Sequence, residues 1–132
     1  MTTAYDRGFY ADLGATSAPS AAAVWPLVLD LVAARSIVDL GCGDGSWLHA
    51  VRGLGVTDTV GVDGPWIADS QLKIPLDTMV RQPLEQPVRL ERRFDLAMTV
   101  EVAEHLTPAR AVGFIEDQTK HAPNVLFYAA IT

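Results

Sequence analysis

The most constraining feature of the sequence is a short apolar run that leads directly into a glycine-rich turn and then into a helical pattern. Residues 36–40, SIVDL, have the length and apolar content of a buried strand. They are followed by GCGDGS (41–46) and WLHAVRGLG (47–55), in which Gly53 and Gly55 are typical helix stop signals. A strand, a glycine turn and a helix in this order predict the first unit of a parallel α/β sheet.

Further strand-like and helix-like segments alternate along the rest of the chain. The expected strands after the first are 57–64, 76–80, 94–100 and 124–131, and the expected helices besides 47–55 are 20–34 and 107–120. Thr107 is a suitable N-cap for the last helix, and Pro108 suits its first position. The pattern predicts a three-layer Rossmann-like sandwich, with a mainly parallel sheet of about five strands and helices on both faces.

The helix expected over 20–34 is the least regular of these segments. Its apolar residues recur at helical spacing, which predicts one buried face made of Val24, Leu27, Val28, Leu31 and Val32. Pro26 lies inside this run, so the helix is expected to start or kink there. We therefore divide the chain into an N-terminal lead-in, residues 1–19, and a single domain, residues 20–132.

Composition and charge limit the classes of partner. The chain is 49% hydrophobic and 20% charged, as in a globular domain, and its net charge is −6. An acidic surface argues against nucleic acid or an anionic membrane as the main partner, which leaves a small molecule or another protein. Cys42 is the single cysteine, and residues 1–14 lack the apolar core of a signal peptide. We expect a cytoplasmic protein.

The glycine turn and the end of the second strand predict a nucleoside site. Ligands of parallel sheets bind beyond the carboxyl ends of the strands, and the carboxylate of Asp63 there can accept hydrogen bonds from both ribose hydroxyls. A dinucleotide fingerprint requires its third glycine at position 46, which is Ser46 here. Asp39 and Asp44 would repel a pyrophosphate but attract a sulfonium and an ammonium group. The charge pattern favours a cationic nucleoside such as S-adenosylmethionine (SAM) over NAD.

Three spaced motifs resemble those of one family. VDLGCGDGSWL (38–48), VGVDG (60–64) and RRFDLAMTVEVAEHL (92–106) are similar, in this order, to motifs of the class I (Rossmann-like) SAM-dependent methyltransferases. The resemblance covers about residues 20–131. It implies that SAM is the cofactor and that a methyl group is transferred to an acceptor.

The resemblance also implies roles for individual residues. Asp39 would orient the methionine ammonium, Asp63 would bind the ribose, and Gly64 would lie beside the adenosine. The turn residues implied along the methionine half of SAM are Gly41, Gly43 and Gly45, with Cys42 packed between them. Val100 and Glu101 would lie near the reacting methyl group.

Glu101 and His105 are the candidate catalytic residues, because either could take a proton from an acceptor. The alternative for both is a structural role at the start of a helix. His49 and His121 are expected on helix surfaces, and no spacing of His, Cys, Asp and Glu suggests a metal site.

Two departures from the family pattern affect the interpretation. Pro83 stands where many members carry an acid for the adenine amino group, for which Gln82 is a possible substitute. The sequence also stops after the expected fifth strand, without the usual C-terminal strands. The apolar edge at 124–131 therefore predicts a homodimer, a partner chain or a shortened chain.

Three functions remain open. The first is a SAM-dependent methyltransferase that acts on a small-molecule acceptor. The second is a catalytically silent SAM-binding module that acts with a partner protein. The third, disfavoured by the glycine spacing, is an NAD-dependent oxidoreductase.

Overall fold

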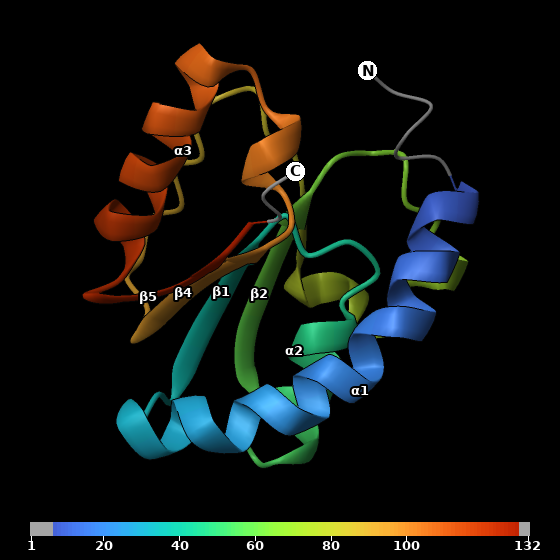
Figure 1. The fold of residues 1–132 in the computed structure, drawn as a ribbon, viewed down its shortest axis with the longest axis vertical. Helices are drawn as coiled ribbons and strands as arrows, with labels where there is room; N and C mark the ends of the chain where they lie inside the picture. The colour runs from blue at the N-terminus through green and yellow to red at the C-terminus, as the bar shows by residue number, and fades with distance from the viewer. Residues whose placement is uncertain (1–6, 130–132) are drawn as a thin grey trace.

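The sheet has five strands, all parallel, in the order β3-β2-β1-β4-β5 (Figure 1). A computed structural model describes residues 7–129 of the chain. The strands are β1 (Ser36–Leu40), β2 (Asp58–Asp63), β3 (Met79–Arg81), β4 (Leu96–Val100) and β5 (Asn124–Tyr128). The α-helices are α1 (Arg7–Leu31), α2 (Ser46–Gly53) and α3 (Pro108–His121). The predicted α/β Rossmann-like fold is confirmed.

The strand order places a topological switch point between β1 and β4. From β1 the chain proceeds to β2 and β3 on one side, and it then returns to the other side of β1 for β4 and β5. Connections from β1 and β4 therefore leave the sheet in opposite directions. A crevice at the carboxyl ends of these two strands is where ligands bind in open parallel sheets.

Two separate cores show that helices cover both faces of the sheet. On one face, Ile37 of β1 packs in a cluster with Trp25 of α1 and Leu48 of α2. On the other face, the alternate β1 residue Val38 belongs to a cluster that contains Phe114 of α3. In Figure 1, α1 and α2 accordingly lie on one side of the sheet and α3 on the other.

The first helix differs from the prediction in its extent. Within the described residues it begins at Arg7, well before the expected start near Ser20, and it continues through Pro19 and Pro26 to Leu31. A proline removes one hydrogen bond and bends a helix, but it need not end one whose neighbours are packed. Residues 1–6 lie outside the described part, and the division at residue 19 stays a prediction.

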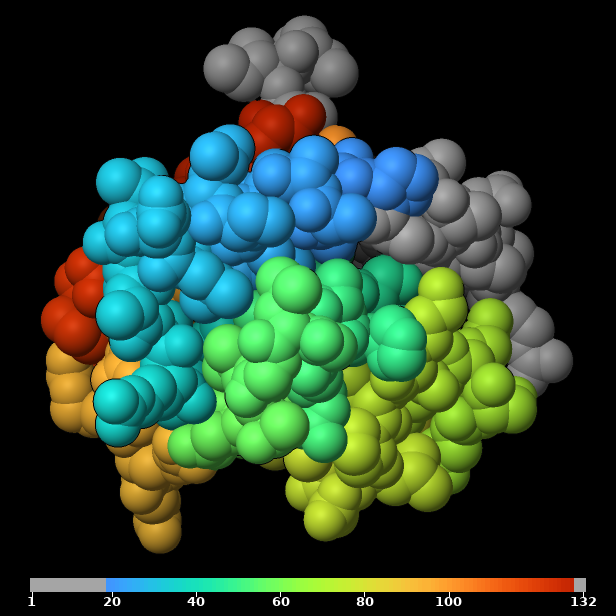
Figure 2. Space-filling view, turned by 90° about the horizontal axis from the view of Figure 1, so that it is seen from below, coloured from blue at the N-terminus to red at the C-terminus, as the bar shows by residue number. Residues whose placement is uncertain are grey.

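The buried face of α1 also differs from the prediction. Leu27 and Leu31 are 67% and 86% exposed, whereas Ala21 and Trp25 are completely buried. The indole Nε1–H of Trp25 donates to the carbonyl oxygen of Trp47 at 2.8 Å, and the two rings meet edge to face. This contact with α2 fixes the rotation of α1, and Figure 2 shows α1 (blue) beside the connection from α2 to β2 (green).

The remaining elements agree with the prediction except around the third strand. Residues 76–78, expected as strand, form a 3-10 turn (Leu76–Thr78), and the Thr78 hydroxyl donates to the carbonyl oxygen of Pro75 at 2.7 Å. β3 therefore starts at Met79 and is only three residues long. The N-cap of α3 is confirmed, because the Thr107 side chain accepts a hydrogen bond from the Arg110 N–H.

Candidate functional site

The turn after β1 lies against the end of β2. Gly41, Gly43 and Gly45 all have positive φ angles. The N–H groups of Gly41 and Cys42 donate to the carbonyl oxygen of Val62 at 2.7 and 3.1 Å. At Gly41, where φ is 89°, an added Cβ would lie 2.5 Å from Cγ2 of Val102. Only glycine suits this position, in both backbone conformation and space.

Asp63, the last residue of β2, fastens the turn to the sheet. Its Oδ2 accepts a hydrogen bond from the Gly43 N–H and its Oδ1 one from the Gly64 N–H, both at 2.8 Å. Its side chain is almost completely buried. Burial raises the pKa of Asp63 to about 6, although the two backbone hydrogen bonds and nearby Arg81 lower it. The carboxylate thus already has backbone partners, and its contact with ribose stays a prediction.

The charge of Asp44 is largely satisfied within the protein. Its Oδ1 accepts hydrogen bonds from the N–H and hydroxyl of Ser46, the first residue of α2, at 3.0 and 2.6 Å. Its other oxygen lies 3.5 Å from the Lys73 ammonium group. Of the two acids expected to attract a cationic ligand at the turn, only Asp39 has a free carboxylate oxygen.

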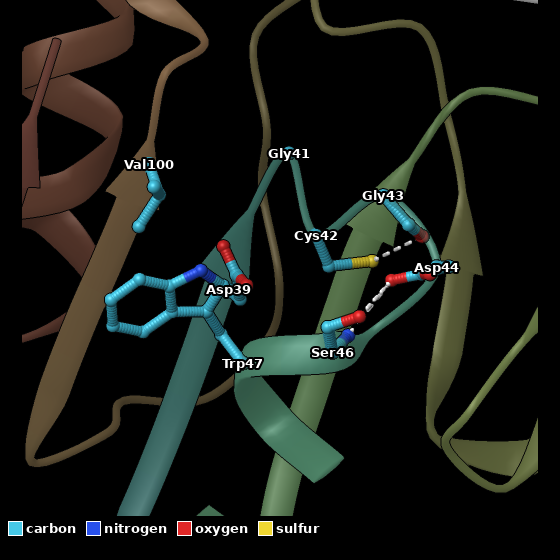
Figure 3. A pocket seen from close by; sticks show the side chains of 8 residues that line it. All are labelled: Asp39, Gly41, Cys42, Gly43, Asp44, Ser46, Trp47 and Val100. Carbon is cyan, nitrogen blue, oxygen red and sulfur yellow. Dashed lines mark hydrogen bonds between the residues drawn. The ribbon is translucent and has the colours of Figure 1, made fainter. Parts of the chain in front are cut away.

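Asp39 and Trp47 bring two buried polar atoms without hydrogen-bond partners to one small cavity. Asp39 is 2% exposed; its Oδ1 and the Trp47 Nε1 are both buried and unpartnered. Figure 3 shows both side chains beside the glycine turn. The cavity, about 20 Å³ in volume, is lined by Asp39, Gly41, Cys42, Gly43, Asp44, Ser46, Trp47 and Val100. This volume suits one water or one ammonium group.

The electrostatics of this cavity favour a cation. Burial, followed by the negative charge of Asp63, raises the pKa of Asp39 well above its usual range. A positive group beside the free oxygen would reverse this shift, because it stabilises the carboxylate. Asp39 thus offers a hydrogen-bond acceptor, and the indole of Trp47 a donor, to a group that enters this cavity.

Cys42 packs inside the turn. Its Sγ lies 3.5 Å from the sulfur of Met79 and 3.5 Å from the carbonyl oxygen of Gly43. Burial, followed by the charges of Asp63, Asp39 and Asp44, raises the pKa of the thiol. A thiol kept neutral in this way is a poor nucleophile, so Cys42 contributes shape to the small cavity and not reactivity.

A larger cavity adjoins the small one at the carboxyl ends of β4 and β5. It measures about 490 Å³ and is lined by Ser20, Val24, Trp47, Val100, Glu101, Leu126, Phe127 and Tyr128. Trp47 and Val100 belong to both cavities. A ligand whose charged end occupied the small cavity could therefore extend towards an acceptor in the larger one.

The two candidate catalytic residues are placed differently. Glu101 lines the larger cavity. Among the described residues other than glycine, it is the one with a positive φ, 57°, which is a left-handed backbone conformation. Its N–H donates to the carbonyl oxygen of Tyr128 at 2.7 Å. His105 ends the 3-10 turn Ala103–His105, has an exposed side chain, and lines neither cavity. Of the two candidates, Glu101 therefore lies at the larger cavity and His105 at neither of these two cavities.

Comparison with known sequences identifies the family. The sequence model of one family, described as "Methyltransferase domain", matches residues 13–127. The chain belongs to this family. Among curated proteins, none matches the sequence.

Solved structures with the same fold include further methyltransferases. The methyltransferase domain of bacterial CtHen1 is 22% identical, with a TM-score of 0.61, and the match covers 80% of this chain and 63% of that one. An O-methyltransferase family protein from Burkholderia thailandensis is 17% identical, with a TM-score of 0.71, and the match covers 86% of this chain and 37% of that one. The SAM-bound amino pentose methyltransferase from Micromonospora echinaspora is 19% identical, with a TM-score of 0.56, and the match covers 86% of this chain and 46% of that one.

These likenesses confirm the resemblance to class I SAM-dependent methyltransferases at the level of fold. The chain spans less than two thirds of the length of each of these three proteins.

Two residues expected near the adenosine, Gly64 and Gln82, have close neighbours within this methyltransferase domain. The Trp66 ring lies so close to Gly64 that an added Cβ would be 2.1 Å from it, which explains a glycine there. Gln82, the possible substitute for the missing adenine acid, already donates its amide N–H to the carbonyl oxygens of Gln86 and Pro87. The replacement of that acid near Pro83 stays a prediction.

The methyltransferase domain also has cavity residues that the sequence pattern did not identify. Leu126, Phe127 and Tyr128 were expected only as a strand, yet they form one wall of the larger cavity. Their place at the carboxyl end of the strand next to β4 was the available signal. Within residues 7–129, no helix is long and apolar enough to cross a bilayer, and no cluster of side chains suits a metal ion.

Proposed function

We propose that the protein is a SAM-dependent methyltransferase that acts on a small molecule in the cytoplasm. The observation that carries this proposal is the pair of unpartnered buried atoms, Asp39 Oδ1 and Trp47 Nε1, beside the glycine turn. A buried acceptor and a buried donor left without partners are unfavourable unless a ligand or water satisfies them. The α-ammonium and carboxylate groups of SAM would satisfy both.

The resemblance to the family implies the other cofactor contacts. The glycine turn would allow close approach of the methionine half, Asp63 would hold the ribose, and Gly64 would lie beside the adenosine. Leu84 and Val102 lie within 3.3 Å of a Cβ added at Gly41, and Ile74 within 3.0 Å of one at Gly45. These side chains pack against the turn and leave no room for a larger residue at either glycine.

Catalysis in this site would depend on positioning. SAM, when bound, supplies a methyl group on a sulfonium, which is already a good leaving group. Holding donor and acceptor in line is then the main contribution of the protein. Val100 separates the cavities at the place where the methyl group would lie, and Glu101 is the proposed proton acceptor. His105 would contribute only after a movement of its 3-10 turn towards the cavity.

The second candidate function is a SAM-binding module without catalytic activity. Pro83, which stands where many members carry an acid for the adenine amino group, favours it. An NAD-dependent oxidoreductase is disfavoured, since the unpaired carboxylate of Asp39 would face a pyrophosphate.

Calorimetric titration separates these functions. We expect heat with SAM and with its demethylated product, S-adenosylhomocysteine, and none with NAD. Asp39→Asn should weaken SAM binding about tenfold or more, because it removes the charge but keeps the shape. Asp30→Asn, at an exposed position on α1, is the matched control.

Two results would overturn the proposal in different ways. A folded sample that binds neither SAM nor its product at millimolar concentration would exclude both SAM-dependent functions. Binding without any conversion of SAM, across a panel of amine, hydroxyl and carboxylate acceptors, would favour the silent module.

A further inference from the structure

We propose that the acceptor is a small organic amine with an aromatic or aliphatic skeleton, which binds in the larger cavity and is methylated on nitrogen. This inference rests on the proposed function and adds the chemical class of the acceptor. It depends on the walls of the cavity, on the one acidic residue in its described lining, and on the lack of histidine and lysine among those lining residues.

The walls of the larger cavity are mainly apolar and aromatic. Trp47 and Tyr128 bring aromatic side chains to its lining. Successive side chains of a strand point to opposite faces, so Tyr128, and not its neighbour Phe127, is the β5 ring offered to a ligand, and it is 54% exposed. Aromatic faces attract ammonium groups as well as apolar surface, and Trp is the strongest in this respect.

Charge in this cavity comes from one side chain. Glu101 is the only residue with a carboxylate or a cationic group in the described lining, and Ser20 adds a neutral hydroxyl. A carboxylate beside aromatic rings selects a protonated amine over an alcohol or an acid of the same shape. The net charge of −6 acts in the same direction, because it raises the local concentration of cations.

The backbone of Glu101 supports a role for its side chain. A left-handed φ at a residue other than glycine carries a strain of roughly 1 kcal/mol or more, and such residues concentrate at functional sites. Glycine would fill this position without strain. The bond from the Glu101 N–H to Tyr128 ties the strained residue to the aromatic wall.

The chemistry of transfer also favours nitrogen. No histidine or lysine is among the described lining residues, so an alcohol would lack a strong base to remove its proton. An amine bound in its ammonium form gives up one proton to the carboxylate of Glu101, and the lone pair of the neutral amine then attacks the sulfonium methyl carbon. The carbon–sulfur bond breaks and its electron pair stays on sulfur. The products are the N-methylammonium ion, a neutral thioether and protonated Glu101.

The volume sets the size of the acceptor. About 490 Å³ is within the usual range of small-ligand pockets, but it is too small for a folded macromolecule. Phenethylamine, its isosteric alcohol and phenylpropanoic acid therefore make a matched set of probes that differ in the terminal group. Ethanolamine tests whether the apolar skeleton is needed.

Binding is measured first, by calorimetry and by tryptophan fluorescence, with S-adenosylhomocysteine present. We expect phenethylamine to bind about tenfold more tightly than phenethyl alcohol, as one cation–π contact and one exposed ion pair would give. Glu101→Gln should remove this preference, whereas Glu104→Gln, on the same connection but outside the lining, should keep it. Methylated phenethylamine, detected by mass spectrometry, should form with SAM.

The outcomes separate the two proposals. If S-adenosylhomocysteine binds but amine and alcohol bind equally, or Glu101→Gln leaves the preference unchanged, the acceptor class is wrong and the proposed function stands. If S-adenosylhomocysteine does not bind, the proposed function fails. Methylation of the alcohol in preference to the amine would also overturn the inference.

Discussion

Asp63 holds the glycine turn in place through two backbone N–H groups, one from the turn and one from the residue that follows β2. A carboxylate in this position links the turn and the strand end directly, so the geometry of the site exists without a ligand. Its cost is burial of a charge, seen in the pKa of about 6. This combination gives the residue a pH signature that can be measured.

The first prediction concerns the pH dependence of stability. The pKa of Asp63 is about 6 in the fold against an ordinary value of 3.8. Its stabilising contribution is therefore fully present below about pH 4 and is lost as the pH rises through 6. The change is roughly 3 kcal/mol, from about 1.4 kcal/mol for each pH unit. Urea denaturation should show the wild type losing stability over this range relative to Asp63→Asn.

A residue that changes stability with pH in the opposite direction serves as the control. The hydrogen bond and charge of Arg92 lower the pKa of Asp58, an exposed residue at the start of β2. Relative to Asp58→Asn, the wild type should therefore gain stability as the pH rises. Equal slopes for the two comparisons would contradict the assigned role of Asp63.

The second prediction tests the donor of the small cavity. Trp47→Phe keeps an aromatic ring, smaller than the indole, but removes the unpartnered N–H. We expect the affinity for S-adenosylhomocysteine to fall roughly tenfold or more, as for a hydrogen bond to a charged group. The affinity for methylthioadenosine, which lacks the amino acid, should be unchanged. Equal loss for both ligands in calorimetry would mean that Trp47 acts only through packing.

At the scale of elements, α3 holds the long connection between β3 and β4 through buried polar contacts. Asp117 accepts hydrogen bonds from the Val88 N–H at 3.0 Å and from Arg110 at 2.5 Å. Arg110 in turn donates to the carbonyl oxygens of Leu84 and Gln86. Because Leu84 also lies against the glycine turn, these contacts position one side of the site.

The third prediction follows from this network. Asp117→Ala leaves the Arg110 guanidinium buried and unpaired, so we expect a loss of roughly 3–5 kcal/mol in the free energy of unfolding. Glu116→Ala, at the adjacent exposed position, should change it by less than about 0.5 kcal/mol. Urea denaturation monitored by circular dichroism measures both. Similar values for the two variants would show that the network contributes little.

Elements with local signals could be predicted, and those decided by distant contacts could not. The unit from Ser36 to Gly53 is specified by an apolar run, a glycine turn and stop residues, all close in sequence. His121 was expected on a helix surface, but it is buried, and its Nε2 accepts a hydrogen bond from the Leu90 N–H at 2.9 Å. That burial depends on a connection distant in sequence, which helical spacing does not encode.

The candidate site shows the same division. Asp39, Gly41, Gly43 and Val100, all named from the motifs, line the small cavity, whereas Gly45 is not among its lining residues. The sequence did not predict that the Trp47 Nε1–H lacks a hydrogen-bond partner, or that Glu101 has a left-handed backbone. Both arise from three-dimensional packing, at the contact of α1 with α2 and of β4 with β5.

At the scale of the whole molecule, β5 lies at one end of the sheet order, paired only with β4 among the described strands. Val125, Phe127 and Tyr128 on this strand are 38%, 43% and 54% exposed. An apolar strand with an unpaired edge is a template for pairing with another chain. The homodimer expected from the sequence stays a prediction.

The fourth prediction tests this edge. We expect sedimentation velocity to show association of the chain that increases with protein concentration. Val125→Lys should shift the protein towards the monomer, because a lysine on an edge strand opposes pairing. Val112→Lys, at an exposed apolar position on α3, should not. A wild type that stays monomeric at high concentration would contradict the prediction.

The shared boundary of the two cavities has a consequence for how this protein can diversify. Trp47 and Val100 line both cavities, so we expect a substitution at either position to change the binding of the methyl donor and of the acceptor together. Val24, Leu126 and Phe127 border only the larger compartment. Under the proposed function, we expect substitutions at these three positions to change the choice of acceptor and to leave the binding of SAM unchanged. They are therefore the first positions to vary in directed evolution.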